Sequence, residues 1–142
     1  MPMQILTFLF LLIVLPCLAF CEEKRTMKIQ LSAGQTVLTA TLLDNPTSRD
    51  FMALLPLTLT LKDYARTEKI SDPPRKLSTE GAPPGSNASA GDITLYAPWG
   101  NLAIFYKDFG YASGLIPLGR IDSGVDMLAH LEGDVTFERI ED

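Results

Sequence analysis

The chain has 142 residues, a formal net charge of −5 and 46% hydrophobic residues. This length suits one domain and is too short for two ordinary ones. The acidic balance argues against a nucleic-acid partner, because proteins that bind nucleic acids usually carry a basic patch that neutralises phosphates.

Residues 1–21 form an apolar leader. Only Thr7 and Pro16 interrupt the run from 5 to 20, which is slightly shorter than the roughly 20 residues of a membrane-spanning helix. We therefore expect a signal peptide and a periplasmic or secreted protein. A retained N-terminal anchor is the alternative, and translation from Met27 would instead give a cytoplasmic protein.

The end of the leader contains both cysteines of the chain, Cys17 and Cys21. Residues 18–21, Leu-Ala-Phe-Cys, resemble a bacterial lipoprotein box, which would place a lipid on Cys21, although the bulky Phe20 departs from that pattern. The membrane is thus an expected partner only through the leader or a lipid. The chain after the leader has no thiol, so it is expected to have no disulfide, no thiolate nucleophile and no cysteine-based zinc site.

Residues 22–26 are a short charged tether, and residues 27–142 form the expected domain. Apolar and polar residues alternate in this part of the chain, as they do in strands with one buried face. The expected strands cover residues 27–32, 36–43, 57–62, 64–70, 93–97, 101–107, 115–121 and 135–140.

Two short helices interrupt the strands. A capping box at residues 47–50 begins the first helix, which ends at about Leu55 before Pro56. A second box-like start at residues 123–126 begins the other, which ends at about Leu131. His130 would lie in its last turn, where its cation would meet the negative end of the helix dipole.

Two segments are expected to lack regular structure. Residues 71–92 contain four prolines and three glycines, and are expected to form a long exposed loop with Leu77 as its one apolar anchor. Residues 108–114 are expected to form a turn. The chain therefore predicts a mainly β fold, a closed barrel of about eight strands with two short helices, because closure removes exposed sheet edges.

Several stretches together resemble the bacterial cyclophilin-like proteins over residues 27–141. They are Ala-Thr-Leu-Leu-Asp-Asn-Pro-Thr-Ser at 40–48, Leu-Leu-Pro at 54–56, Gly-Asp-Ile-Thr-Leu-Tyr at 91–96, Pro-Trp-Gly-Asn-Leu-Ala-Ile-Phe-Tyr at 98–106 and Ile-Pro-Leu-Gly-Arg-Ile at 116–121. The resemblance implies a cyclophilin-like β-barrel with a helix near each end.

The resemblance implies little about activity, because this family is largely without an established function. True cyclophilins are peptidyl-prolyl isomerases with a groove built around an arginine. Arg66, Trp99 and His130 share residue types with members of that groove, but none lies in a matching motif. No catalytic residue is therefore assigned, and we expect no cofactor and no metal site.

Three residues are candidate ligand-binding residues: Arg66, Trp99 and Arg120. Trp99, between Pro98 and Gly100, would stack on a ligand if exposed, or would cap the core if packed over the barrel mouth, which is the commoner role of aromatic side chains. Arg66, with Glu68 and Lys69, would bind a carboxylate beneath the long loop, or would belong to a solvated strand edge of mixed charge.

The resulting functional hypothesis is an exported, non-enzymatic module that binds a small molecule or an extended peptide beside the long loop and the Trp99 turn. Two alternatives stay open. One is a peptidyl-prolyl isomerase, and the other is an interaction module tethered to the membrane by its leader.

Overall fold

The computed structural model describes Pro16 and residues 27–141. The expected leader, the tether and the candidate lipidation site Cys21 lie outside these residues. The described elements are β1 (Met27–Ala33), β2 (Thr36–Leu42), α1 (Pro46–Ala53), β3 (Leu57–Tyr64), β4 (Glu68–Ser71), β5 (Gly85–Ala88), β6 (Asp92–Tyr96), β7 (Asn101–Phe105), β8 (Gly110–Ser113), β9 (Leu115–Ser123), α2 (Val125–Leu128) and β10 (Gly133–Arg139).

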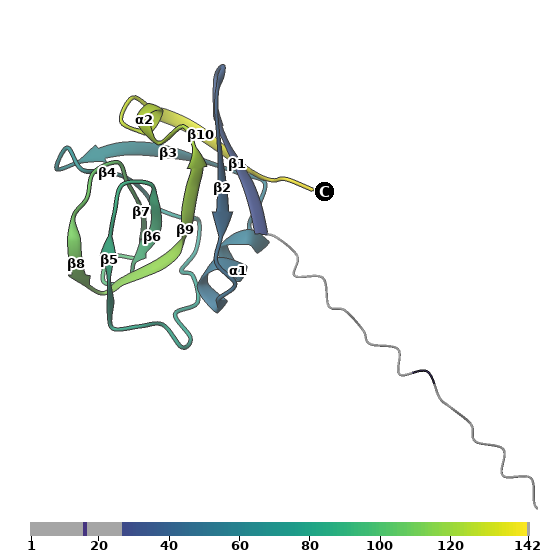
Figure 1. Ribbon diagram of the computed structural model, residues 1–142, viewed down its shortest axis with the longest axis vertical. Coiled ribbons are helices and arrows are strands. Elements are labelled where there is room, and N and C mark those ends of the chain that lie inside the picture. Colours follow the sequence, from purple (N-terminus) through teal and green to yellow (C-terminus); the bar gives the residue numbers. More distant parts are fainter. Residues whose placement is uncertain (1–15, 17–26, 142) are drawn as a thin grey trace, which may run out of the picture.

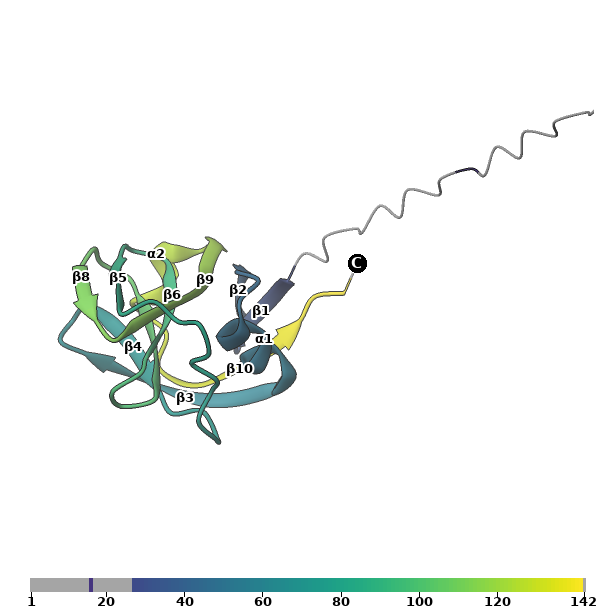
Figure 2. The same ribbon diagram turned by 90° about the horizontal axis from the view of Figure 1, so that it is seen from below.

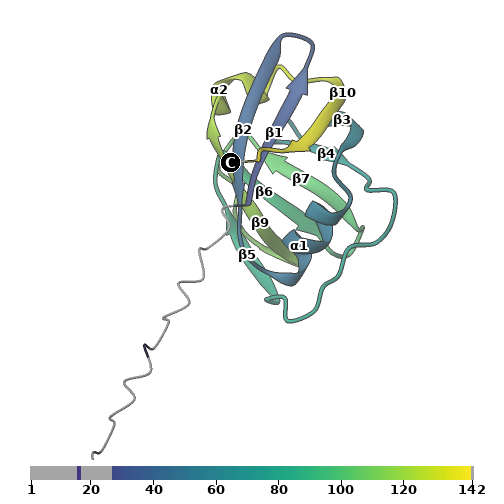
Figure 3. The same cartoon turned by 90° about the vertical axis from the view of Figure 1, so that its right-hand side faces the viewer.

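Eight strands close into an antiparallel barrel in the order β1-β10-β3-β4-β7-β6-β9-β2 (Figure 1). The two ends of the described chain meet in it, because β1 pairs with β10 as well as with β2. Helix α1 lies at one end of the barrel and α2 at the other (Figure 3). The predicted fold class and the predicted helix near each end are confirmed.

The barrel interior follows from the alternation of the strands. In β1, Ile29 and Leu31 point inward, and the register places them opposite Ala40 and Leu38 of β2. Leu59 and Leu61 of β3 are likewise buried, whereas Thr58 and Thr60, which alternate with them, are exposed. One face of most barrel strands therefore supplies the apolar core that holds the fold together, whereas β4 contributes no residue to it.

Helix α1 begins at a different cap from the predicted one. Asn45 is the N-cap: its side chain accepts a hydrogen bond from the Ser48 N–H, and Pro46 occupies the first turn. The predicted box at residues 47–50 is wrong, because its two ends bond elsewhere. Thr47 donates to the Ser78 carbonyl, and Asp50 accepts from the Ser78 N–H.

Helix α2 is shorter than predicted and begins after Gly124, which makes no side-chain cap. Ser123 belongs to the end of β9 and bonds Thr39 instead. Because the helix ends at Leu128, His130 lies beyond its last turn rather than within it.

A two-stranded sheet, β5 with β8, was not predicted (Figures 1 and 2). Its strands fall in the expected loop 71–92 and the expected turn 108–114, where glycine, serine and asparagine give little strand propensity. The sheet lies outside the barrel and covers a second apolar cluster that includes Ala88, Ala103, Phe105 and Leu115. Tertiary packing therefore overrides the weak local preference.

The rest of the long loop is attached to α1. Arg75 donates to both carboxylate oxygens of Asp50, at 2.9 and 2.7 Å. Leu77 is buried in the main core, so its predicted role as an apolar anchor is confirmed. Within residues 27–141, no helix is long and apolar enough to cross a membrane.

Candidate functional site

The outer face of β3, β4 and β7 carries side chains in rows that cross the three strands. The register pairs Lys62 of β3 with Ile70 of β4, and Ile70 with Ala103 of β7. Nearer the β3–β4 turn, Tyr64 pairs with Glu68. Diagonal neighbours on such a face lie roughly 7–8 Å apart, close enough for one small ligand to reach several of them.

The same spacing of two residues per row continues along the strands in the direction away from the β3–β4 turn. Asp72 comes directly after the last residue of β4, and the register of Ser71 with Leu102 brings it beside Asn101. Thr60 of β3 belongs to this row, but its hydroxyl already donates to Asp134 at 2.8 Å. The side chains at this end of the outer face therefore all carry oxygen atoms.

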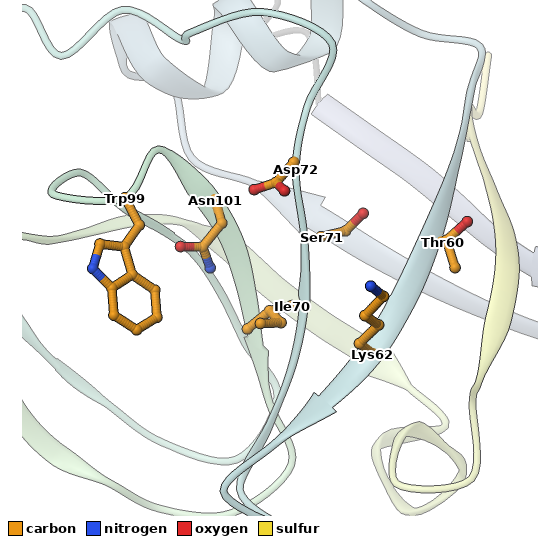
Figure 4. Close-up of a pocket in the computed structure, with 7 residues that line it drawn as sticks. All are labelled: Thr60, Lys62, Ile70, Ser71, Asp72, Trp99 and Asn101. Atoms are coloured by element: carbon orange, nitrogen blue, oxygen red, sulfur yellow. The ribbon is translucent and has the colours of Figure 1, made fainter.

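A hollow of about 260 Å³ lies over these rows (Figure 4). Trp99 stands on one side of it and Lys62 on the other, with Ile70 between them and Asp72 beside Asn101. Its lining residues are Thr60, Lys62, Ile70, Ser71, Asp72, Trp99 and Asn101, which we call the Trp99 groove.

Trp99 does not cap the barrel core. It is 63% exposed and belongs to the turn between β6 and β7. Two tyrosines hold its ring edge-to-face: Tyr96 with a centroid separation of 5.3 Å and Tyr64 with 5.9 Å. Such pairs contribute about 0.5–1.5 kcal/mol beyond buried area. The indole is thus both exposed and held in place, which suits a stacking surface.

Asn101 carries an unpaired polar atom. The residue is only 4% exposed, and its amide nitrogen donates to the Leu102 carbonyl at 2.9 Å. Its Oδ1 atom is buried and has no hydrogen-bond partner among the described residues. An unsatisfied buried acceptor costs about 1–3 kcal/mol, so a ligand that donates a hydrogen bond there would remove this cost.

Both charged groups of the Trp99 groove are also available. Lys62 and Asp72 are exposed, and within residues 27–141 neither forms an ion pair. In the row beyond Lys62, burial raises the pKa of Glu68 above its ordinary value. The groove therefore offers one cation and one anion, on opposite sides of an apolar floor.

A second polar cluster lies on the inner face of the same strands. Lys69 is 1% exposed, and its ammonium is 3.3 Å from an Asp63 carboxylate oxygen and 5.6 Å from the centre of the Tyr106 ring. The Tyr106 hydroxyl donates to Asp63 at 2.5 Å. This bond, and then Lys69, lowers the pKa of Asp63, while the carboxylate raises the pKa of Tyr106 to about 12.

This cluster corrects one prediction. Lys69 was expected on a solvated strand edge, but β4 lies between β3 and β7 and has no free edge. Because Lys69 is opposite Ile104, it shares the inward face. Its charge is enclosed and already partnered, so the cluster is structural rather than a site open to a ligand.

The other two candidate binding residues lie away from the Trp99 groove. Arg66 is in the β3–β4 turn with a positive φ of 53°, and its N–H donates to Asp63. Arg120 of β9 is paired with Asp92 at 2.6 Å and also donates to the Ala90 carbonyl. The structure therefore does not bring these three residues together, and of the three only Trp99 lines the groove. Ligand binding at Arg66 and Arg120 stays a prediction.

Two further observations bear on chemistry. In the described part of the chain, no group of three His, Cys, Asp or Glu side chains is arranged to hold a metal ion. A second hollow, lined by α1 and the long loop, contains the paired Asp50 and lies open to solvent.

The sequence alone indicated Trp99 but not the other members of its groove. Lys62 and Asp72 are single charges in an ordinary strand and an ordinary loop start. Asn101 comes two residues after Trp99, and this proximity in the sequence is the one local signal that could have indicated Asn101 as a member of the groove. Their proximity depends on strand register, which a single sequence does not determine.

The comparisons with known proteins agree with this fold. In the solved structures, the chain is similar to a hypothetical protein from Archaeoglobus fulgidus, with a TM-score of 0.61 and 18% identity over 84% of this chain and 99% of that one. At this identity the likeness concerns the fold alone. No curated protein matches the chain. The model of the cyclophilin-like family matches residues 31–138. The chain therefore belongs to the cyclophilin-like family, as its motifs predicted.

Proposed function

We propose that this protein is an exported, non-enzymatic binding module that takes a small ligand or a short extended peptide in the Trp99 groove. The main support is the exposed Trp99 ring, held by two tyrosines beside the unpaired Asn101 Oδ1. An apolar platform with a few convergent polar groups is the usual composition of a ligand site.

The size of the groove favours a small occupant. Its volume of about 260 Å³ lies just below the roughly 300–1,000 Å³ of typical ligand pockets. A peptide would therefore place only one or two residues in it and leave the rest outside.

The sole tryptophan of the chain provides the test. We would titrate the protein with a capped Ala-Pro-Phe tripeptide and with L-phenylalanine, following Trp99 emission and heat of binding. We expect saturable binding that Trp99→Leu weakens at least tenfold, because a stacking surface is lost. The control is Phe109→Leu, an exposed aromatic outside the groove. Equal binding by Trp99→Leu and the unaltered protein would refute the assignment.

Prolyl isomerisation is the enzymatic alternative, and the same tripeptide tests it. The residues that line the groove include no arginine, and its cation is Lys62. We expect the exchange rate between cis and trans tripeptide, measured by NMR, to equal that in buffer. Acceleration that Trp99→Leu removes would make the protein an isomerase.

Export is proposed from the apolar leader at residues 1–21, with the periplasm or the medium as destination. Intact mass and N-terminal sequencing of the mature protein test this. Loss of the leader supports a signal peptide, a diacyl mass on Cys21 supports a lipid-tethered module, and a chain that begins at Met1 or Met27 contradicts export by cleavage.

A further inference from the structure

The Trp99 groove contains two opposite charges that lie near each other but do not form an ion pair. Lys62 lies opposite Ile70, and Asp72 is two residues beyond Ile70 on the same face, so the two are diagonal neighbours. Opposite charges at this separation would attract, yet no ion pair joins them in the described chain. Each is therefore free to bind a group of opposite charge on a ligand that lies between them (Figure 4).

The anionic end of the groove has a second acceptor. Asn101 lies in the same row as Asp72, and its buried Oδ1, which points toward the Trp99 side of the groove (Figure 4), has no donor in residues 27–141. A lone N–H could satisfy only one of these two acceptors, whereas an ammonium has three donors to share between them. Charge-assisted hydrogen bonds of this kind are about twice as strong as neutral ones.

The other end of the groove suits an anion. Lys62 presents a mobile ammonium on a four-carbon stem, which can follow a carboxylate without a fixed geometry. The half-buried Ile70 lies between the two ends, and Trp99 stands beyond Asn101 on the side of the groove away from Lys62 (Figure 4). These surfaces would take an apolar or aromatic side chain.

We propose that the ligand of the Trp99 groove is a small zwitterion, an α-amino acid with an apolar or aromatic side chain. Lys62 binds its carboxylate, Asp72 and Asn101 Oδ1 bind its ammonium, and its side chain packs on Trp99 and Ile70. This rests on the proposed binding function and adds the class of ligand to it.

Four probes separate the contributions of the two charges, with affinity measured by calorimetry on the mature protein. They are L-phenylalanine, phenethylamine, which lacks the carboxylate, 3-phenylpropionate, which lacks the ammonium, and N-acetyl-phenylalanine amide, which lacks both charges. We expect L-phenylalanine to bind at least tenfold more tightly than each of the other three, because each of them loses at least one charge-assisted bond.

Two variants assign the charges to residues. Lys62→Met should weaken phenylalanine about tenfold and leave phenethylamine unchanged. Asp72→Asn should weaken phenylalanine and phenethylamine and leave 3-phenylpropionate unchanged. Lys76→Met and Asp126→Asn, exposed charges outside the groove, are the matched controls and should bind all four probes normally. Because both altered groove charges are exposed, melting temperatures should be preserved.

The outcomes distinguish this proposal from the function on which it rests. If N-acetyl-phenylalanine amide binds as tightly as phenylalanine and Trp99→Leu abolishes both, the groove binds neutral peptide groups and the zwitterion proposal is overturned. If the capped tripeptide binds and none of the four probes does, the zwitterion proposal is likewise overturned. If neither the four probes nor the tripeptide binds, the binding function fails together with the proposal.

Discussion

At the residue scale, the Asp63–Lys69–Tyr106 cluster shows what a closed barrel does to a charged side chain. Lys69 is enclosed on the inward face opposite Ile104, so the ammonium depends on Asp63 for a counter-charge. Removing one partner of a buried ion pair is far more damaging than replacing the buried ion with an apolar side chain, because only the former leaves an uncompensated charge.

This difference gives a prediction about two substitutions. Asp63→Asn should lower the melting temperature at pH 7 by several degrees, since it leaves the Lys69 ammonium unpaired. Lys69→Met should be neutral or stabilising, because Asp63 keeps the Tyr106 hydroxyl and is partly exposed to water. Thermal unfolding followed by circular dichroism measures both. A larger loss in Lys69→Met would contradict the account.

The pH dependence of the same cluster has a definite sign. The pKa of Asp63 lies below its ordinary value of 3.8 in the folded protein, so the folded chain binds the proton more weakly than the unfolded one. Stability from this carboxylate is complete above pH 3.8 and is lost as pH falls through the lower, folded value. Unfolding titrations at pH 7 and pH 3 should show that Asp63→Asn loses less stability on acidification than the unaltered protein.

At the element scale, helix α1 closes one end of the barrel through a single aromatic anchor. Phe51 is fully buried and meets Phe137 edge-to-face, with ring centres 5.7 Å apart. Ser48 adds a buried hydrogen bond from its hydroxyl to the Leu118 carbonyl of β9. The helix has only eight residues, too few to be stable alone in water, so this packing maintains it.

Truncating that anchor should therefore be costly. Phe51→Ala should destabilise the protein by about 3–5 kcal/mol, the usual range for a core phenylalanine that leaves a cavity. Urea unfolding measures the change, with Phe109→Ala, an exposed aromatic, as the control that loses about 1.5 kcal/mol or less. A similar loss in both variants would show that α1 does not close the core as described.

At the scale of the whole molecule, the two ends of the described chain are joined in the sheet. The pairing of Leu31 with Phe137 and of Gln30 with Glu138 closes the barrel between its first and last strands. Neither strand then has a free edge on which another chain could add. The barrel should consequently fold as one cooperative unit.

A chain that begins at Met27 tests this directly. We expect it to unfold in urea with one sigmoidal transition and the same midpoint by fluorescence and circular dichroism, as small single domains do. Removing β10 as well, by ending the chain at Glu132, should abolish that transition, because the barrel opens and β1 and β3 each lose one of their two neighbouring strands. A cooperative transition in the shorter chain would show that closure is not needed for folding.

What the sequence by itself determined is local, because alternation and turn residues act within a few positions. It predicted seven of the eight barrel strands close to their observed bounds and part of β4. It also predicted the approximate positions of both helices and an apolar interior. What only the tertiary structure decided is which strands meet. The inward Lys69, the outer sheet of β5 and β8, and the meeting of Trp99 with Lys62 and Asp72 all depend on pairing and register between strands. Of these strands, β4 and β7 lie far apart in the sequence, and so do β5 and β8. The local alternation determines which face of a strand is buried, but not which residue of which other strand lies opposite, so it does not specify these contacts.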